Sequence, residues 1–231
     1  MSLKLILELI FPRFCLGCYK PGSYLCHQCQ NKIPFIKITL CPLCERPSPY
    51  GQTHPGCQAS FSLDGLTILS DYGGLTKTVI KKLKYHSVFE LTTTLVQLFL
   101  KKYPQLPIKA DFITFIPLHS RRERERGFNQ ALLLTKLLAK NYKIPCCPFL
   151  VKKINTQPQM SINNWQQRKA NVKNVFSFCK TYVLKEKTVI LVDDVATTGA
   201  TLGEAAKVLK RNGACKVWGL VVARKVPLQF K

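Results

Sequence analysis

Paired cysteines near the N-terminus constrain the fold of this chain most. Seven of the eleven cysteines lie before residue 58, in three Cys-x-x-Cys pairs and a final His-x-x-Cys pair. Each Cys-x-x-Cys turn can direct two thiolates at one ion, and a second pair completes the tetrahedron that zinc prefers. Residues 1–58 contain few large apolar side chains, and a segment of this length cannot build its own core. It needs a bound metal to hold it together. Four pairs therefore predict two structural zinc sites, because full ligand sets leave no open position for a substrate.

The order in which the pairs combine follows less directly. The shorter links favour consecutive pairing, although interleaved pairing stays open. Consecutive pairing gives one site from Cys15, Cys18, Cys26 and Cys29, and a second from Cys41, Cys44, His54 and Cys57. The alternative for the second site is that His54 is a loop residue and not a ligand. His27 lies inside a pair and is expected to be a bystander. Ordinary thiols are expected at Cys146, Cys147, Cys179 and Cys215.

No apolar run approaches the roughly 18 residues needed to span a bilayer. Residues 1–14 lack the long apolar segment and small-residue cleavage site of a secretory signal, so we expect a cytoplasmic protein with reduced cysteines. Leu3, Ile6, Leu7 and Ile10 have helical spacing and predict an amphipathic helix that Pro12 ends. We expect that helix to pack on its own domain. Peripheral contact with the inner face of the membrane is the alternative.

The net charge is +23, from 35 Lys and Arg against 12 Asp and Glu. A compact chain with this excess repels itself, and a polyanionic partner is the usual reason for it. Nucleic acid is the first expectation and an anionic membrane the second. A generally basic proteome is the alternative explanation.

From about residue 60 the pattern changes from cysteine pairs to apolar, β-branched runs. Strands are predicted at 66–69, 112–117, 188–192 and 216–222, and helices at 75–85, 88–103, 129–141 and 200–212. Near-continuous apolar strands between amphipathic helices indicate a parallel sheet with helices on both faces. We therefore predict an α/β domain over residues 60–231, preceded by a small zinc-ribbon-type domain over residues 1–58. A ligand site is expected at the carboxyl ends of the strands.

The run Val-Ile-Leu-Val-Asp-Asp-Val-Ala-Thr-Thr-Gly-Ala-Thr at 189–201 is the most informative stretch. A predicted buried strand ends in Asp193 and Asp194, and a loop of small and hydroxyl residues leads into a helix. Such a loop can wrap a phosphate with backbone N–H groups, Thr hydroxyls and the helix N-terminus. The two acids can accept hydrogen bonds from vicinal hydroxyls, so a phosphorylated ribose fits the combination. A Mg²⁺-binding acid pair or a capped helix is the alternative.

Residues 189–201 resemble, at every position, the phosphoribosyl pyrophosphate (PRPP) signature of type I phosphoribosyltransferases. The resemblance implies that Asp193 and Asp194 hold the ribose 2′ and 3′ hydroxyls, with Mg²⁺ accompanying PRPP. It also implies that the following loop holds the 5′-phosphate, through Ala196, Thr197, Thr198, Gly199, Ala200 and Thr201.

A second segment at 116–130, Ile-Pro-Leu-His-Ser-Arg-Arg-Glu-Arg-Glu-Arg-Gly-Phe-Asn-Gln, follows the predicted strand at 112–117. Arginines in a strand-end loop can clamp pyrophosphate, whereas alternating Arg and Glu can equally form a solvated helix with internal ion pairs. On the first interpretation the pyrophosphate loop consists of Leu118, His119, Ser120, Arg121 and Arg126.

The run from Arg126 to Gln130 resembles a hallmark of the ComF family, as does the order of paired cysteines followed by a phosphoribosyltransferase-like domain. His54 stands where family members often have cysteine. A third element resembles the same family, with a spacing about one residue longer than its pattern: residues 156–159, Arg168, Asn171 and Phe176.

ComF proteins are cytosolic competence proteins used in natural transformation. The resemblance therefore implies that this chain helps incoming single-stranded DNA enter the cytosol or reach recombination, with other DNA-uptake or recombination proteins as partners. The residues support this through charge, because Lys77, Lys81 and Lys84 share one face of the predicted helix at 75–85. Further candidate DNA contacts are Arg122, Arg124, Arg168 and Lys173, with Tyr85 and Trp165 available to stack on bases. Alternatively, each cluster is a solvated helix face.

Three functions fit the sequence. The first is a transformation factor that binds both PRPP and single-stranded DNA. The second is an active phosphoribosyltransferase, in which an unidentified acceptor displaces pyrophosphate from C1 of the ribose; no catalytic base is assigned. The third is a catalytically silent scaffold that recruits protein partners through its zinc domain.

Overall fold

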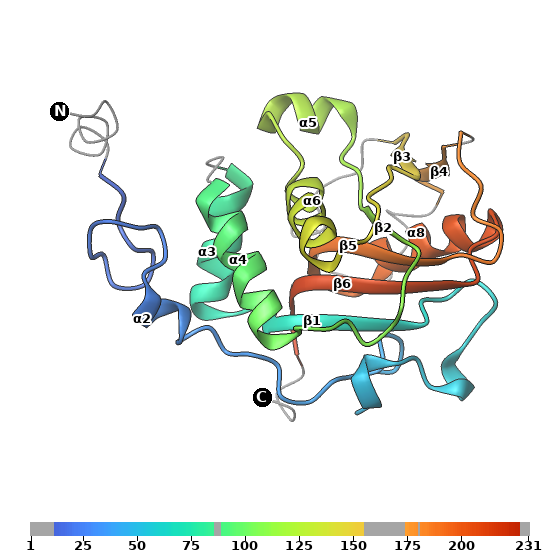
Figure 1. The fold of residues 1–231 in the computed structure, drawn as a ribbon, viewed down its shortest axis with the longest axis horizontal. Coiled ribbons are helices and arrows are strands. Elements are labelled where there is room, and N and C mark those ends of the chain that lie inside the picture. The colour runs from blue at the N-terminus through green and yellow to red at the C-terminus, as the bar shows by residue number, and fades with distance from the viewer. Residues whose placement is uncertain (1–11, 86–88, 155–173, 180, 227–231) are drawn as a thin grey trace.

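The computed structural model describes residues 12–85, 89–154, 174–179 and 181–226. A four-stranded parallel sheet forms the centre of the fold, in the order β1-β6-β5-β2 (Figure 1). The strands are β1 (Gly65–Asp71), β2 (Phe112–Phe115), β5 (Thr188–Ala196) and β6 (Lys216–Arg224). Each strand contains most of a predicted apolar run, and the predicted α/β class is confirmed.

Helices cover both faces of this sheet. One face carries α3 (Gly74–Tyr85), α4 (Phe89–Lys102) and α6 (Gln130–Tyr142); the other carries α8 (Ala200–Arg211). A separate antiparallel pair, β3 (Leu150–Lys152) and β4 (Phe176–Phe178), packs on the α8 side. Four short elements complete the described fold: α2 (His27–Gln30), η1 (Pro49–Gly51), η2 (Pro55–Cys57) and α5 (Ser120–Arg126).

The central strand β5 shows why these sequences are so uniformly apolar. Ile190 and Val192 pack into the core beside α3, α4 and α6. Val189 and Leu191, which alternate with them, pack into the core beside α8. Since successive side chains point to opposite faces, a strand covered on both sides needs an apolar residue at nearly every position.

The N-terminal segment packs on the α/β domain at two separate places. Residues 13–33, the first ribbon, place Cys15, Leu25 and Cys29 in the same apolar core as α3 and α4. Residues 39–58, the second ribbon, lie at the other end of β1, where Gln52 bridges to Gly65. The change of composition near residue 58 therefore does not separate two cores.

Residues 34–38 join the two ribbons and run along the open edge of β1 (Figure 1). The Ile36 N–H donates to the Leu69 carbonyl at 3.1 Å, and the Ser70 hydroxyl donates to the Pro34 carbonyl at 2.9 Å. Lys102 of α4 adds a hydrogen bond from Nζ to the Ile36 carbonyl at 2.7 Å. The linker thus covers a sheet edge that would otherwise expose unpaired backbone groups.

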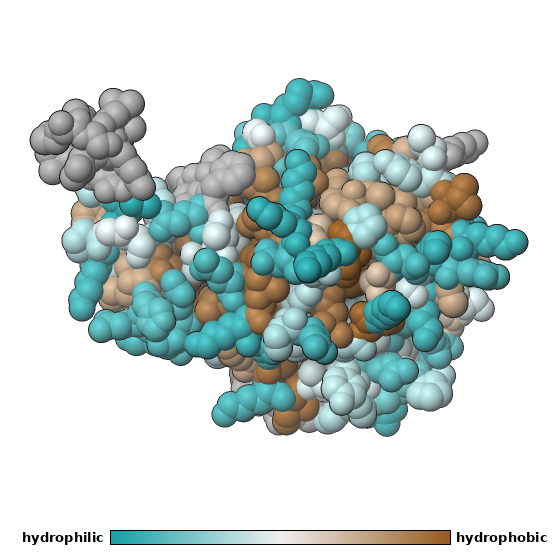
Figure 2. Space-filling model, in the orientation of Figure 1, coloured by the Kyte–Doolittle hydropathy of each residue, from teal (hydrophilic) through white to brown (hydrophobic). Residues whose placement is uncertain are grey.

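Hydrophilic side chains cover much of the face seen in Figure 2, with smaller apolar patches between them. Among the described residues, no helix is long and apolar enough to cross a membrane. The amphipathic helix predicted around residues 3–10 lies outside the described residues.

Candidate functional site

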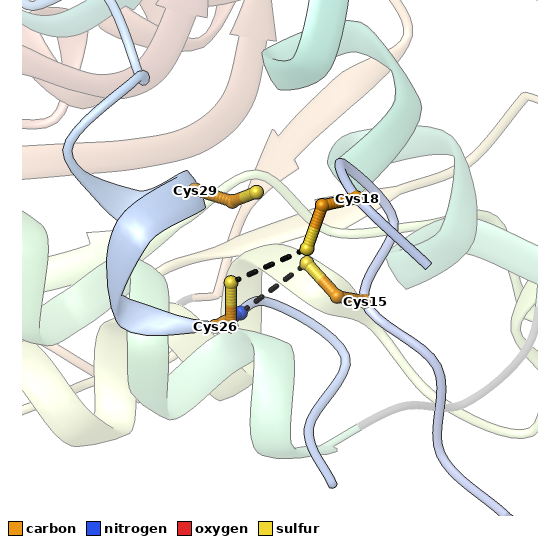
Figure 3. Close-up of side chains that lie close together, drawn as sticks. All are labelled: Cys15, Cys18, Cys26 and Cys29. Carbon is orange, nitrogen blue, oxygen red and sulfur yellow. Dashed lines mark hydrogen bonds between the residues drawn. The ribbon is translucent and has the colours of Figure 1, made fainter. Parts of the chain in front are cut away.

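The first ribbon brings four cysteines together in the consecutive order that the shorter links favour. The sulfur atoms of Cys15, Cys18, Cys26 and Cys29 all lie within 4.8 Å of one another (Figure 3). Gly17 is required inside this turn, because a Cβ there would lie 2.7 Å from the Cys29 sulfur. Four ligand atoms at this spacing can surround a single metal ion.

The electrostatics of this group fit a divalent metal. Burial alone would raise the pKa of Cys15, but backbone N–H groups of Cys26 and Gly17 donate to its sulfur and lower the pKa to about 6. Burial and the neighbouring thiols raise the pKa of Cys29 to about 12. Four thiols this close cannot all ionise without a compensating cation, which zinc supplies when bound. The first group is therefore a structural zinc site.

The second ribbon gathers Cys41, Cys44, His54 and Cys57, with ligand atoms again within 4.8 Å of one another. His54 Nδ1 lies 3.3 Å from the Cys44 sulfur, and His54 Nε2 lies 3.0 Å from the Pro47 carbonyl oxygen. A proton on Nε2 can donate to that carbonyl, which leaves the Nδ1 lone pair for a metal. Hydrogen bonds from Arg46 lower the pKa of Cys44 to about 6. His27 belongs to neither group among the described residues.

The two acids of the 189–201 run lie inside β5 rather than after it. The strand continues to Ala196, because Asp193 still pairs with Val221 and Ala196 with Arg224 of β6. The expected strand end at 192 was therefore four residues short. Asp194 is 7% exposed, and its Oδ2 lies 2.8 Å from Lys84 Nζ at the end of α3. The Asp194 N–H donates to Asp193 Oδ1 at 2.8 Å.

This acid pair is poised to accept a positively charged or hydrogen-bond-donating ligand. Burial and the adjacent Asp194 carboxyl raise the pKa of Asp193 to about 8, although Lys84 acts in the opposite direction. Two adjacent carboxylates repel each other when both are ionised, and the charge of Lys84 alone does not compensate both. Ribose hydroxyls or a Mg²⁺ ion would stabilise the ionised pair, which is the chemistry that the sequence predicts here.

Cations from three elements lie within electrostatic reach of the pair or of its partner Lys84. Lys84 comes from α3, Arg126 from the end of α5, and Lys152 from β3. Burial, helped by the nearby Arg122, lowers the pKa of Lys152 to about 8, and Asp193 opposes the shift. A dense positive field beside two acids suits a polyphosphate carrying its own metal ion.

The predicted phosphate loop joins β5 to α8. Gly199 has φ of 73° and forms the N-cap of α8, a left-handed conformation that glycine adopts without steric cost. Thr198 Oγ1 accepts from the Ala200 N–H at 3.3 Å. Residues 197–200 form one wall of a cavity of about 850 Å³. The N-terminal N–H groups and dipole of α8 favour an anion at this loop.

Within the 118–126 segment, residues 120–126 form the helix α5, and Leu118 and His119 precede it. The His119 side chain accepts from the Arg121 N–H at 3.3 Å and caps it. Arg121 Nε donates to Glu125 at 3.0 Å, with both side chains mostly exposed. This is the solvated, self-paired helix that the alternating charges also allowed. Leu118 and His119 are half-buried and Ser120 is exposed. Of the five predicted pyrophosphate-loop residues, Arg126 is one of the charges that act on Lys84, and its own effect is to lower the Lys84 pKa; pyrophosphate binding by this segment stays a prediction.

The Arg-Gly-Phe-Asn-Gln run has a clear structural role. Gly127 ends α5 with φ of 77°. Asn129 is buried; its Oδ1 accepts from the N–H groups of Ala131 and Leu132, and its Nδ2 donates to the Ile116 carbonyl at 3.1 Å. Arg126 donates to Gln130 at 3.2 Å. The run therefore turns the chain from α5 into α6, and the Gln130 contact holds Arg126 at the end of α5, within electrostatic reach of Lys84.

The predicted nucleic-acid contacts fall into three groups. Lys77 and Lys81 are exposed on α3, and Arg124 is exposed on α5. The Lys84 side chain is only 16% exposed and pairs with Asp194, so it is less accessible to DNA than Lys77 or Lys81; Arg122 is half-buried near Lys152. Arg168, Lys173 and residues 156–159 lie outside the described residues, as does the side chain of Tyr85.

Sequence reasoning missed Lys84 and Lys152 as members of the acid-pair site. Lys84 has the same helical spacing as Lys77 and Lys81, which are exposed. Nothing in the local pattern distinguishes it as the lysine that pairs with Asp194 of β5. Lys152 comes from β3, a short strand of the separate antiparallel pair, and no motif surrounds it. Only the fold brings these two cations to β5.

Comparison with known proteins agrees with both halves of the chain. Residues 6–58 match the double zinc ribbon domain, and residues 136–226 match the phosphoribosyl transferase domain. The DNA utilization protein YhgH of Escherichia coli is 30% identical over 228 residues, covering 92% of this chain and 98% of that protein.

Two further relatives carry competence in their names. Competence protein ComFC of Bacillus subtilis is 28% identical over 207 residues, covering 84% of this chain and 81% of that protein. Competence protein F of Haemophilus influenzae is 32% identical over 211 residues, covering 86% of this chain and 90% of that protein. The resemblance noted in the sequence is thereby confirmed, and the chain belongs to the ComF family of competence proteins.

Proposed function

We propose that this protein is a cytoplasmic natural-transformation factor that binds Mg²⁺·PRPP at residues 193–201 and single-stranded DNA on separate basic surfaces. The names of its relatives support a role in competence and DNA utilization. The observation that carries the PRPP part is the acid pair of β5, in which Asp194 is buried and Asp193 half-buried. The pair adjoins the phosphate loop, and Lys84 lies 2.8 Å from Asp194.

The arrangement suits PRPP piece by piece. Ribose hydroxyls would donate to Asp193 and Asp194, and the 5′-phosphate would lie at the N-terminus of α8. Mg²⁺ with the pyrophosphate would then lie among Lys84, Arg126 and Lys152. The two acids and the polyphosphate are all negatively charged, and Mg²⁺ would offset the repulsion between them.

Calorimetric titration of Mg²⁺·PRPP tests this site. The wild-type protein is expected to bind, and the double variant Asp193→Ala with Asp194→Ala is expected to lose binding. Asp111→Asn is the matched control, because Asp111 is an exposed acid that pairs with Lys187 at 3.2 Å and accepts from the N–H of Thr188, the first residue of β5. A folded wild-type protein that takes up no PRPP, with or without DNA, would contradict the proposal.

The DNA part rests on the net charge of +23 and on exposed cations such as Lys77, Lys81 and Arg124. Backbone phosphates bind such side chains without sequence preference, and the affinity then falls steeply with salt. DNA-uptake or recombination proteins would be the protein partners of such a factor.

Turnover is the second candidate function. The cluster of Lys84, Arg126 and Lys152 beside the intact acid pair favours it, because charge stabilisation is the main contribution that such a site makes to pyrophosphate departure. Release of pyrophosphate from Mg²⁺·PRPP, measured with candidate acceptors and with the acid-pair variant as control, separates turnover from binding alone.

A further inference from the structure

The second ribbon lies directly against the phosphate loop. The cavity of about 850 Å³ has residues 197–200 and Gly203 of α8 on one side and residues 42–45 of the second ribbon on another. A Cβ on Gly199 would lie 3.9 Å from the Pro42 carbonyl oxygen, so the two backbones are within van der Waals reach. The ribbon is therefore a wall of this cavity.

Arg224 joins the ribbon to the sheet. It ends β6, directly opposite Ala196 of β5, and is 2% exposed. Its Nη2 donates to Glu45 Oε1 at 2.7 Å and to the Pro42 carbonyl at 3.3 Å. The Nη1 of the same guanidinium is buried and hydrogen-bonds to none of the described residues. Arg224 also lines the cavity, so the residue that holds Pro42 and Glu45 is itself part of the cavity wall beside the phosphate loop.

The metal ligands fix the part of the ribbon that Arg224 holds. Cys41 and Cys44 flank Pro42 and Leu43, so an ion bound to both thiolates closes the turn that faces the phosphate loop. Without that ion, the turn loses its main constraint, because so short a segment has no core of its own. Pro42 and Glu45 would then no longer be held against Arg224.

The first ribbon has no such link. Its ion pair to the α/β domain runs from Arg13 to Glu90 of α4, at 2.6 Å, and Gly17 contacts Leu75 of α3. None of its described residues lines the cavity at residues 197–200. The two metal sites therefore differ in their relation to the phosphate loop, and one serves as a control for the other.

We propose that the second ribbon is part of the phosphate-binding site, with Arg224 as the positioning residue, so that metal binding by Cys41, Cys44, His54 and Cys57 strengthens the binding of a sugar phosphate. The proposal rests on the proposed PRPP function and adds a structural partner to it. Because coupling between two ligands is reciprocal, PRPP also strengthens retention of the metal in the second ribbon.

Titration of Mg²⁺·PRPP into the zinc-loaded, full-length protein tests this inference. Cys57→Ser removes a ligand of the second ribbon and is expected to weaken the PRPP Kd about tenfold or more, or about 1.4 kcal/mol. Cys18→Ser, its counterpart in the first ribbon, should lose a zinc ion and keep the wild-type Kd within about twofold. Glu45→Gln keeps all eight metal ligands and should weaken the Kd about threefold, whereas Glu90→Gln should not.

Zinc release to a chromogenic chelator gives a second readout. Mg²⁺·PRPP should slow the release phase that Cys57→Ser abolishes and leave the phase that Cys18→Ser abolishes unchanged. Wild-type Kd values in Cys57→Ser and Glu45→Gln would overturn the coupling while leaving the PRPP site intact. Equal weakening by the first-ribbon variants would also overturn it, because general destabilisation would then explain the effect. Absence of PRPP binding in the wild type would contradict both this inference and the proposed function.

Discussion

Lys84 Nζ lies 2.8 Å from Asp194 Oδ2, and the two side chains are 16% and 10% exposed. Burial alone would lower the pKa of Lys84, but the Asp194 carboxylate outweighs it and raises the pKa. The pair ties the end of α3 to β5 at the point where the chain carries its acid pair. The Lys84–Asp194 ion pair therefore contributes to the stability of the fold and also sets the charge beside Asp193.

Lys84→Met is expected to lower the free energy of unfolding by about 3 kcal/mol, because breaking a buried pair leaves one charge uncompensated. Adding Asp194→Asn should recover much of the loss, since the orphaned charge is then gone. Urea unfolding of the two single variants and the double variant at pH 7 measures this. Simple addition of the two single effects would show that the residues do not stabilise each other.

The pH dependence of stability should report Asp193. Its pKa is about 8 in the folded protein against a usual value of 3.8, so between these values the folded state holds more protons than the unfolded state. Stability attributable to this group therefore falls as pH rises through that window and levels off above it. Asp193→Asn should raise Tm, and by more at pH 8 than at pH 4.

Asp111 provides a control of opposite sign. The Thr188 N–H and Lys187 lower its pKa, so its contribution is present at neutral pH and is lost as pH falls. Asp111→Asn should lower Tm at pH 7 and have little effect in acid. If Asp193→Asn behaved like Asp111→Asn, burial would not dominate at Asp193.

The sequence predicted the sheet, its main helices and the grouping of metal ligands for simple physical reasons. Strands buried on both faces must be apolar throughout, as the run at 189–192 is. Cysteine spacing restricts which thiols can meet. The two acids and the small-residue loop that leads into α8 follow from local order along one strand, loop and helix, so their arrangement could be predicted before the fold was known; their binding of PRPP stays a prediction.

Long-range packing is what the sequence left open. Arg224 sits in an apolar strand with no motif around it, yet it holds the second ribbon through Glu45, 179 residues away along the chain. The extension of β5 to Ala196 depends on pairing with β6 and not on local preference. Alternating charges at 120–126 fitted a loop or a helix equally, and only the capping by His119 decides between them.

The zinc content per chain should depend on the first group of cysteines, Cys15, Cys18, Cys26 and Cys29. Cys15→Ser should release about one zinc per chain and loosen more than the first ribbon, because Cys15 is buried in the core shared with α3 and α4. A loss of about 2 kcal/mol would lower Tm by about 4–8 °C. Zinc analysis with thermal unfolding measures both effects, and Cys215→Ser, an exposed cysteine outside both groups, should change neither. Unchanged zinc in Cys15→Ser would remove this site from the account.

Single-strand binding should depend on the exposed face of α3. Lys77→Gln with Lys81→Gln removes two exposed cations and should reduce the slope of log affinity against log salt by about 1.4, since each phosphate contact on a single strand contributes about 0.7. Lys136→Gln with Lys140→Gln removes the same charge from α6. Fluorescence anisotropy over a salt series measures both slopes. Equal reductions would mean that net charge, not this face, governs DNA binding.

The most direct test measures both ligands on one variant. Asp193→Ala with Asp194→Ala should abolish calorimetric binding of Mg²⁺·PRPP while single-stranded DNA affinity stays within about twofold of wild type, because the acids lie inside β5 and the exposed lysines lie on α3. Circular dichroism of the variant confirms that it is folded. Retained PRPP binding, or an equal loss of DNA binding, would contradict an account in which the acid pair holds PRPP at a site separate from the DNA surface.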